Sequence, residues 1–143
     1  MPSREVSVEA SPVLDPAEVM SLYEAVGWTA YTDEPSTLEA ALAGSSLVLA
    51  ARCEGRLVGL ARVISDGATV CYVQDLLVHP DAQRTGVGRT LMLAVLKHFA
   101  GVRQKVLLTD DEPGQRVFYE SVGFRETRDH GVGSLRAFVR FDS

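Results

Sequence analysis

The chain has 143 residues, 46% of them hydrophobic and 23% charged, and this balance predicts a single globular domain over residues 1–143. A net charge of −5 argues against a nucleic-acid partner, because binding a phosphate backbone requires a basic face. The sequence has neither a secretory signal pattern nor an apolar run of the roughly 20 residues that cross a bilayer. We therefore expect a cytoplasmic protein that does not enter membranes.

The first half of the chain predicts two helices and a series of antiparallel strands. Asp15 as N-cap, Pro16 at the first helical position and Glu18 in a capping box begin a helix that Gly27 ends. A second capping box at Ser36 predicts a shorter helix. Alternating or continuous apolar runs, separated by turn residues, predict strands. These strands cover residues 5–10, 46–53, 57–64 and 69–78.

Two large aromatic side chains, Trp28 and Tyr31, lie in the predicted loop between these helices. Aromatic side chains dominate the burial of most cores, so both residues could simply cover the core. Alternatively, they form the wall of a substrate pocket. The sequence leaves both interpretations open.

The second half predicts one parallel crossover and a C-terminal pair of strands. An amphipathic helix over residues 88–100 separates the strand at 69–78 from a short buried strand at 105–109. Pro113 begins a further helix, and strands are expected at residues 124–128 and 135–141. The resulting class is α+β, with helices packed on a mixed, mostly antiparallel sheet of six to seven strands.

The loop after the strand at 69–78 carries the pattern Gln83-x-x-Gly86-x-Gly88 and leads directly into the long helix. Backbone N–H groups at a helix start bind anions, and glycines let a ligand approach the backbone closely. A dinucleotide fingerprint fails because its third glycine would fall at Leu91. A P-loop fails because no Lys-Ser/Thr pair follows. The loop is therefore an anion site of another kind.

Two signatures together resemble the GCN5-related N-acetyltransferase (GNAT) superfamily. The first is Gln83-x-x-Gly86-x-Gly88 after a strand, and the second is the aromatic helix end from Phe118 to Phe124. The resemblance covers nearly the whole chain. It implies the GNAT fold, with helices on both faces of the sheet and splayed fourth and fifth strands, and it implies binding of acetyl-CoA.

The resemblance also assigns roles to individual residues. The backbone of residues 76–78 would pair with the pantetheine arm, and N–H groups of residues 84–89 would bind the pyrophosphate. Tyr119 would protonate the departing thiolate or donate a hydrogen bond to it. The residues implied to bind the cofactor are Leu76, Leu77, Val78, Gln83, Arg84, Thr85, Gly86, Val87, Gly88, Arg89, Thr90, Phe118 and Tyr119. One departure is Gln115, in a region where many members of the family have an asparagine.

Acetyl transfer to an amine also needs a proton acceptor. Removing the proton from a lysine-like amine at pH 7 costs about 4 to 5 kcal/mol. Asp75 is the only carboxylate inside its strand and is the leading candidate, although it could instead be a structural residue paired with Arg62. Tyr72 could relay a proton through water. The predicted acceptor pocket consists of Trp28, Tyr31 and Tyr72.

The function expected from these residues is transfer of an acetyl group from acetyl-CoA to a primary amine of a small molecule. Segments such as residues 62–67 and 74–78 are similar to small-molecule members of the superfamily. Cys53 and Cys71 have neither metal nor redox spacing, so we expect two buried thiols and no metal. Homodimers are common in the family. The alternatives are a non-catalytic CoA-binding sensor or subunit, and an N-acetyltransferase acting on proteins or peptides.

Overall fold

A computed structural model describes residues 5–142 of the chain. The chain divides into two compact units, the first ending at Leu108 and the second beginning at Thr109. The first unit contains the sheet, and the second contains one α-helix and irregular segments.

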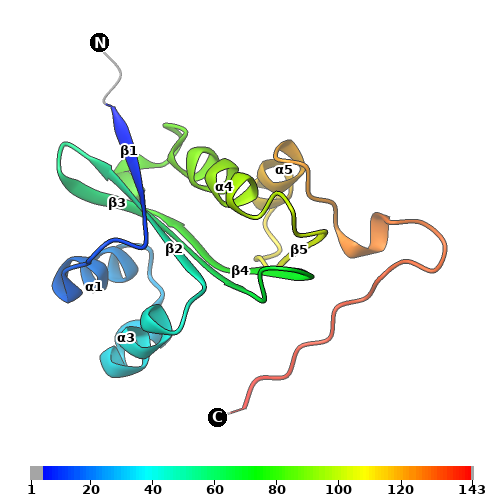
Figure 1. Ribbon diagram of the computed structural model, residues 1–143, viewed down its shortest axis with the longest axis horizontal. Helices are drawn as coiled ribbons and strands as arrows, with labels where there is room; N and C mark the ends of the chain where they lie inside the picture. The colour runs from blue at the N-terminus through cyan, green and yellow to red at the C-terminus, as the bar shows by residue number, and fades with distance from the viewer. Residues whose placement is uncertain (1–4, 143) are drawn as a thin grey trace. The chain divides into compact units, whose positions relative to one another are not determined.

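The first unit is built on one open sheet of five strands in the order β1-β2-β3-β4-β5 (Figure 1). The strands are β1 (Val6–Ala10), β2 (Leu47–Cys53), β3 (Arg56–Ser65), β4 (Val70–Val78) and β5 (Gln104–Leu107). Neighbours from β1 to β4 are antiparallel, and β5 is parallel to β4. The mixed sheet with one parallel crossover confirms the expected class, but the number of strands is smaller than predicted.

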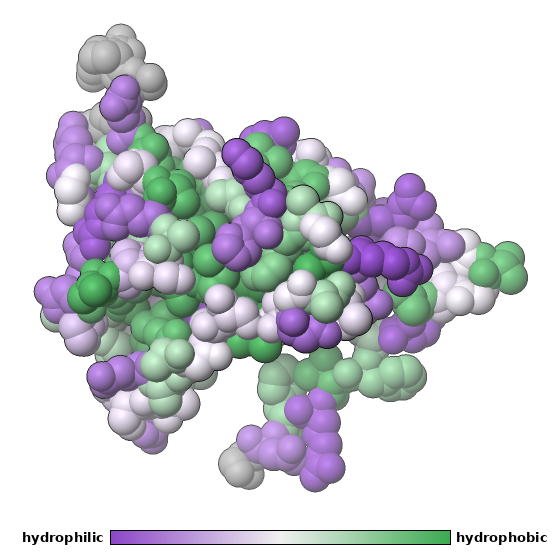
Figure 2. Space-filling view, viewed as in Figure 1, coloured by the Kyte–Doolittle hydropathy of each residue, from purple (hydrophilic) through white to green (hydrophobic). Residues whose placement is uncertain are grey.

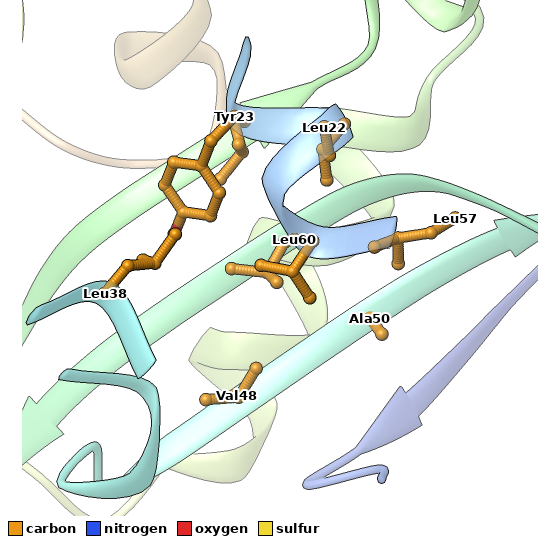
Figure 3. Close-up of a cluster of buried hydrophobic side chains, with 9 residues drawn as sticks. Leu22, Tyr23, Leu38, Val48, Ala50, Leu57 and Leu60 are labelled. Atoms are coloured by element: carbon orange, nitrogen blue, oxygen red, sulfur yellow. The ribbon is translucent and has the colours of Figure 1, made fainter. Parts of the chain in front are cut away.

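Helices cover both faces of this sheet. Those of the first unit are α1 (Pro16–Ala25), α2 (Thr29–Thr32), α3 (Pro35–Ala43) and α4 (Val87–His98). Gly59 and Leu60 are neighbours on β3, so they face opposite sides. A Cβ on Gly59 would lie 2.9 Å from the Val87 side chain, which places α4 on one side. Leu60 belongs to the cluster that packs under α1, which places α1 on the other (Figure 3).

The core between α1, α3 and the sheet fixes the position of the central strands. In Figure 3 the Tyr23 ring of α1 points toward Leu38 of α3, above the side chains of β2 and β3. Tyr23 and Leu60 are fully buried, and Leu77 of β4 belongs to the same cluster. Complete burial of an apolar side chain contributes about 1.5 to 3 kcal/mol. This packing holds β4 against α1.

A β-bulge interrupts β4 near its middle. Arg62 pairs with Asp75, and the next residue of β3, Val63, pairs with Val73, so Gln74 is an extra residue. Residues two apart normally share a face of a strand. Here Asp75 shares the α1 face with Arg62, whereas Val73 shares the opposite face with Val63. The bulge therefore redirects side chains at this point, as bulges beside functional sites commonly do.

The pairing between β4 and β5 covers only part of β4. It joins Val70–Val73 to Gln104–Leu107, and β4 continues to Val78 without a strand partner on that side among the described residues. The predicted splaying of the fourth and fifth strands concerns this region of the sheet. Backbone groups of the second half of β4 are thus left beside an open edge.

The capping residues predicted for the helix starts are confirmed only in part. The Asp15 side chain accepts a hydrogen bond from the backbone N–H of Ala17 at 3.0 Å, which confirms the N-cap. The capping-box role of Glu18 is wrong, because its carboxylate binds Arg52 of β2 at 2.9 Å instead. The capping box at Ser36 is also wrong, since α3 begins at Pro35 without a side-chain cap. The loop expected at residues 27–34 contains α2.

The second unit contains α5 (Pro113–Ser121) and a 3-10 turn (Thr127–Asp129). The strand predicted at residues 124–128 is wrong. Arg116 of α5 forms ion pairs with Glu126 and Asp129, each at 2.7 Å. These contacts bend residues 126–129 into a turn, which excludes an extended strand.

The strand predicted at residues 135–141 is also wrong. This segment, orange to red in Figure 1, has no strand partner among the described residues, and the sheet has five strands rather than six or seven. Phe138 and Phe141 are 94% and 91% exposed. Both hydrophobic and hydrophilic groups lie on its surface (Figure 2). An alternating pattern produces a half-buried strand only when a sheet edge pairs with it.

Candidate active site

The loop between β4 and α4 forms the first part of the candidate site. After β4 ends, a 3-10 turn at Pro80–Ala82 reverses the chain. The Gln83 side chain donates a hydrogen bond back to the carbonyl oxygen of Val78 at 3.2 Å. This contact closes the loop onto the end of β4 and explains why a long amide side chain suits position 83.

The start of α4 presents backbone donors to the solvent. Gly86 is its N-cap, with φ of 90°, and no side chain caps the helix. The N–H groups of Val87 and Gly88 consequently have no acceptor within the helix. A Cβ on Gly86 would meet no protein atom within 4 Å, so a ligand has room beside this backbone. Together with the partial positive charge of a helix start, this geometry suits a phosphate group.

The residues predicted to contact the cofactor in this unit lie along a continuous path from the end of β4 into α4. Leu77 is buried, whereas Leu76 and Val78 are half-buried. The Thr90 hydroxyl donates to the carbonyl oxygen of Gly86 at 2.8 Å and steadies the first turn of α4. Arg84, just before the glycines, also has a positive φ of 63°, a conformation that is uncommon outside glycine. Their contacts with a cofactor stay predictions.

A buried polar cluster lies on the other side of β4, centred on Asp75. Asp75 is only 2% exposed, and its carboxylate accepts three hydrogen bonds. The donors are Tyr23 Oη at 2.9 Å, Tyr31 Oη at 2.9 Å and Arg62 Nε at 2.8 Å. The pairing with Arg62 that the sequence allowed is thus present. The structure also ties α1 and α2 to β4 through this one carboxylate.

Tyr31 is the most highly connected hydroxyl of this cluster. It donates to Asp75 and accepts from Arg62 Nη2 at 3.3 Å and from Gln74 Nε2 at 3.2 Å. A hydroxyl has one donor and about two acceptor positions, so Tyr31 is fully satisfied. Asp75 keeps about one unused lone-pair direction, on Oδ1, out of about four. Any proton acceptance by Asp75 would have to use that direction.

The electrostatics of the cluster follow from its burial. Burial lowers the pKa of the Arg62 guanidinium, but the bonds with Asp75 and Tyr31 outweigh it and give a net increase. Burial, followed by the charge of Asp75, raises the pKa of Tyr23 far above its ordinary value. Burial also raises the pKa of Tyr72, with smaller effects from Tyr31 and Asp75. All three side chains therefore keep their protons at neutral pH.

The three aromatic residues predicted for the acceptor pocket differ in their surroundings. Trp28 packs against the core, with its ring centroid 6.0 Å from that of Tyr23 and 6.2 Å from that of Tyr31, so it covers the core and adjoins the Tyr31 ring. Tyr31 and Tyr72 are half-buried, and both interact electrostatically with Asp75 or its partners. Tyr31, Tyr72 and Asp75 are thus brought together in the first unit.

Tyr119 and Phe118 lie on α5 in the second unit. The Tyr119 ring is half-buried, with centroids 5.0 Å from Phe118 and 6.1 Å from Phe124. Burial raises the pKa of the Tyr119 phenol, and a hydrogen bond with Thr109 has a smaller, opposite effect. Tyr119 therefore holds its proton at neutral pH, which is the form that a general acid needs.

Sequence reasoning missed two members of the polar cluster. Tyr23 appeared only as an apolar position of an amphipathic helix, yet a buried tyrosine hydroxyl requires a partner, and this rule is the signal that could have identified it. Gln74 reaches Tyr31 only because of the β4 bulge. No local sequence feature indicated that bulge.

Three further observations concern metal binding, membrane spans and cysteines among the described residues. Among residues 5–142, no group of three or more His, Cys, Asp or Glu side chains is placed to bind a metal ion. No described helix is long and apolar enough to span a membrane. Cys71 is buried as expected, whereas Cys53 is only partly buried, and both are free thiols.

Comparison with known proteins gives a consistent family. The protein-family model described as an acetyltransferase (GNAT) domain matches residues 16–140 of this chain. The chain is 29% identical to the uncharacterized N-acetyltransferase ycf52 of Porphyra purpurea over 128 residues, which cover 86% of this chain and 71% of that protein.

Solved structures agree with the family model. A GNAT family acetyltransferase of Streptococcus pneumoniae TIGR4 superposes with a TM-score of 0.80 at 30% identity, and 96% of this chain and 98% of that chain are covered. The aminoglycoside N-acetyltransferase AAC(6')-Iy in complex with CoA shares the fold, with a TM-score of 0.70 at 17% identity over 97% and 95% of the two chains.

Proposed function

Because the chain belongs to the GNAT acetyltransferase family, we propose that it transfers an acetyl group from acetyl-CoA to a primary amine of a small molecule. The observation that carries this proposal is the end of β4, where an open strand edge, a glycine loop and an uncapped helix start follow one another. These three features supply an extended backbone edge and an anion site side by side.

The residues present fit the cofactor. The open space beside Gly86 and the N–H groups of Val87 and Gly88 suit its pyrophosphate. The backbone of residues 76–78 would bind the pantetheine arm as an added strand. Gln83 to Thr90, with Phe118 and Tyr119, complete the proposed contacts. When bound, acetyl-CoA supplies an activated thioester, and the protein positions it and manages the protons.

Asp75 is the proposed acceptor of the amine proton. Its carboxylate is buried and held by three donors, with one lone-pair direction left on Oδ1. That arrangement favours acceptance through a water molecule over direct contact with the amine. Tyr31, which donates a hydrogen bond to the carboxylate, and Tyr72, which interacts with it electrostatically, would position this water and the acceptor.

Tyr119 is the proposed donor to the departing sulfur. Its half-buried phenol keeps its proton at neutral pH, because burial raises its pKa. A donor with a pKa at or above that of the thiol delivers a proton only as negative charge develops on the sulfur. The Phe118 and Phe124 rings restrict how the Tyr119 side chain turns.

A small cationic acceptor is supported by the charge of the protein and by its relatives. The net charge of −5 favours approach of an amine that is protonated in solution. Aminoglycoside acetyltransferases share the fold, one of them solved with sisomicin. A cytoplasmic location and a homodimer stay predictions, and no metal has a role in this proposal.

An assay of thiol release from acetyl-CoA across a panel of amines tests the proposal. We expect turnover with at least one small amine and none with peptides. Turnover with peptides alone would favour a protein or peptide acetyltransferase. Acetyl-CoA binding without turnover on any amine or peptide would favour a sensor or a non-catalytic subunit, and would contradict the enzymatic proposal.

A further inference from the structure

A cavity of about 470 Å³ lies in the first unit between α1, α3 and β2. Most of its lining is apolar, with Met20 from α1, Leu42 from α3 and Val48 from β2 contributing side chains. This volume lies within the range of about 300 to 1,000 Å³ that is typical of small-molecule pockets. None of its lining residues belongs to β4, the glycine loop or α4, so the cavity is distinct from the site proposed for acetyl transfer.

The walls of this cavity are preformed. Three of its lining residues are prolines, at positions 12, 16 and 35, and their fixed φ angles restrict the surrounding backbone. Ser11 has a positive φ of 47° and its N–H donates to the carbonyl oxygen of Val48. Backbone strain of this kind persists only where the surrounding structure imposes it, and it clusters at binding sites.

One charged residue lines the cavity. Glu39 of α3 is exposed, and it forms no ion pair with any other residue in the described part of the chain. An exposed carboxylate at the border of an apolar cavity attracts a ligand that carries one positive charge beside an apolar body. A neutral ligand gains nothing from Glu39, and an anionic ligand is repelled by it.

We propose that this cavity binds a small apolar amine, with its hydrocarbon part against Met20, Leu42 and Val48 and its ammonium group at Glu39. The inference does not rest on the proposed acetyl transfer. The cavity also adjoins the polar cluster, because Ser45, one of its lining residues, accepts a hydrogen bond from Arg62 at 3.5 Å. A bound amine would therefore lie close to residues that hold Asp75.

Binding of hexylamine, hexanol and hexanoate to the protein without acetyl-CoA tests the proposal. Chemical shifts in two-dimensional NMR spectra report both the affinity and the residues perturbed. We expect hexylamine to bind most tightly and hexanoate least, with shifts concentrated in α1, α3 and the start of β2. Equal binding of the three probes, or shifts confined to β4 and α4, would overturn the proposal.

Two variants make the test specific. Glu39→Gln should weaken hexylamine binding about two- to fivefold, the range of an exposed ion pair, and leave hexanol binding unchanged. Glu24→Gln is its control, because Glu24 lies on α1 and does not line the cavity. Ala43→Leu places a larger side chain at the lining and should remove binding of both probes. Unchanged hexylamine binding in either lining variant, with the fold verified by circular dichroism, would contradict the assignment.

Discussion

At the scale of single residues, Asp75 has the contacts of a structural residue and is also the proposed proton acceptor. Its side chain is 2% exposed and accepts hydrogen bonds from Arg62, Tyr23 and Tyr31, as the carboxylate of a structural ion pair does. It also interacts electrostatically with the half-buried Tyr72, and it lies in the half of β4 that has no β5 partner. The stability of α1 and α2 on the sheet and the proposed proton transfer therefore depend on the same carboxylate.

Replacing Asp75 by Asn should lower the free energy of unfolding by about 3 kcal/mol, because it leaves the Arg62 guanidinium buried without its counter-charge. Urea denaturation measures this loss. Asp33→Asn, an exposed carboxylate outside the cluster, is the control and should change stability by less than about 0.5 kcal/mol. Equal stability of the two variants would mean that the ion pair contributes nothing.

The Tyr119→Phe variant should lose about 100- to 10,000-fold in kcat, the usual contribution of a general acid, with little change in acetyl-CoA affinity. Burial raises the pKa of the Tyr119 phenol above its ordinary value of 10.0, and the protonated form is the active one. The pH at which half of the wild-type activity is lost through this group should thus lie above 10. Collapse of cofactor affinity with an unchanged rate per bound complex would make Tyr119 structural.

At the scale of elements, the contact between β3 and α4 sets the position of the glycine loop. A Cβ on Gly59 would lie 2.9 Å from Val87 Cγ1 and 3.0 Å from Leu91 Cδ1. Both side chains belong to the first turns of α4, directly after Gly86. The absence of a side chain at position 59 thus allows the helix start to approach the sheet.

Gly59→Ala should destabilise the protein by about 1 to 3 kcal/mol, the usual cost of overpacking, and should weaken acetyl-CoA binding by shifting α4. Thermal unfolding and calorimetry measure the two effects. Gly101→Ala is the matched control, because a Cβ there meets no atom within 4 Å. A Gly59→Ala variant as stable as Gly101→Ala would show that α4 does not depend on this close approach.

Local patterns predicted the elements that local chemistry determines. The period of Leu91, Val95 and Phe99 between two strands indicated α4 and the crossover, and the glycine pattern located the helix start. The β4 bulge and the Asp75 cluster were less visible, because residues 23, 31 and 75 meet only through tertiary packing. The prediction of the C-terminal strands was wrong for the same reason. Alternation of apolar and polar residues in 135–141 does not specify which sheet edge the segment would pair with.

At the scale of the whole molecule, the family match from residue 16 to 140 spans both compact units. The first unit carries the anion site and the Asp75 cluster, and the second carries Tyr119. The proposed reaction therefore needs residues from each unit. A fragment ending at Leu108 should bind acetyl-CoA more weakly than the whole chain and should show no turnover.

The central claim is that the loop between β4 and α4 binds acetyl-CoA, and calorimetric titration of three proteins tests it most directly. The wild type should bind acetyl-CoA, and Gly86→Val should not, because the new side chain would fill the space beside the helix start. Gly67→Val is the matched control, with a positive φ of 73° in a turn at the other end of β4. It should bear similar backbone strain yet keep its affinity. Equal affinity of Gly86→Val and the wild type would contradict the account.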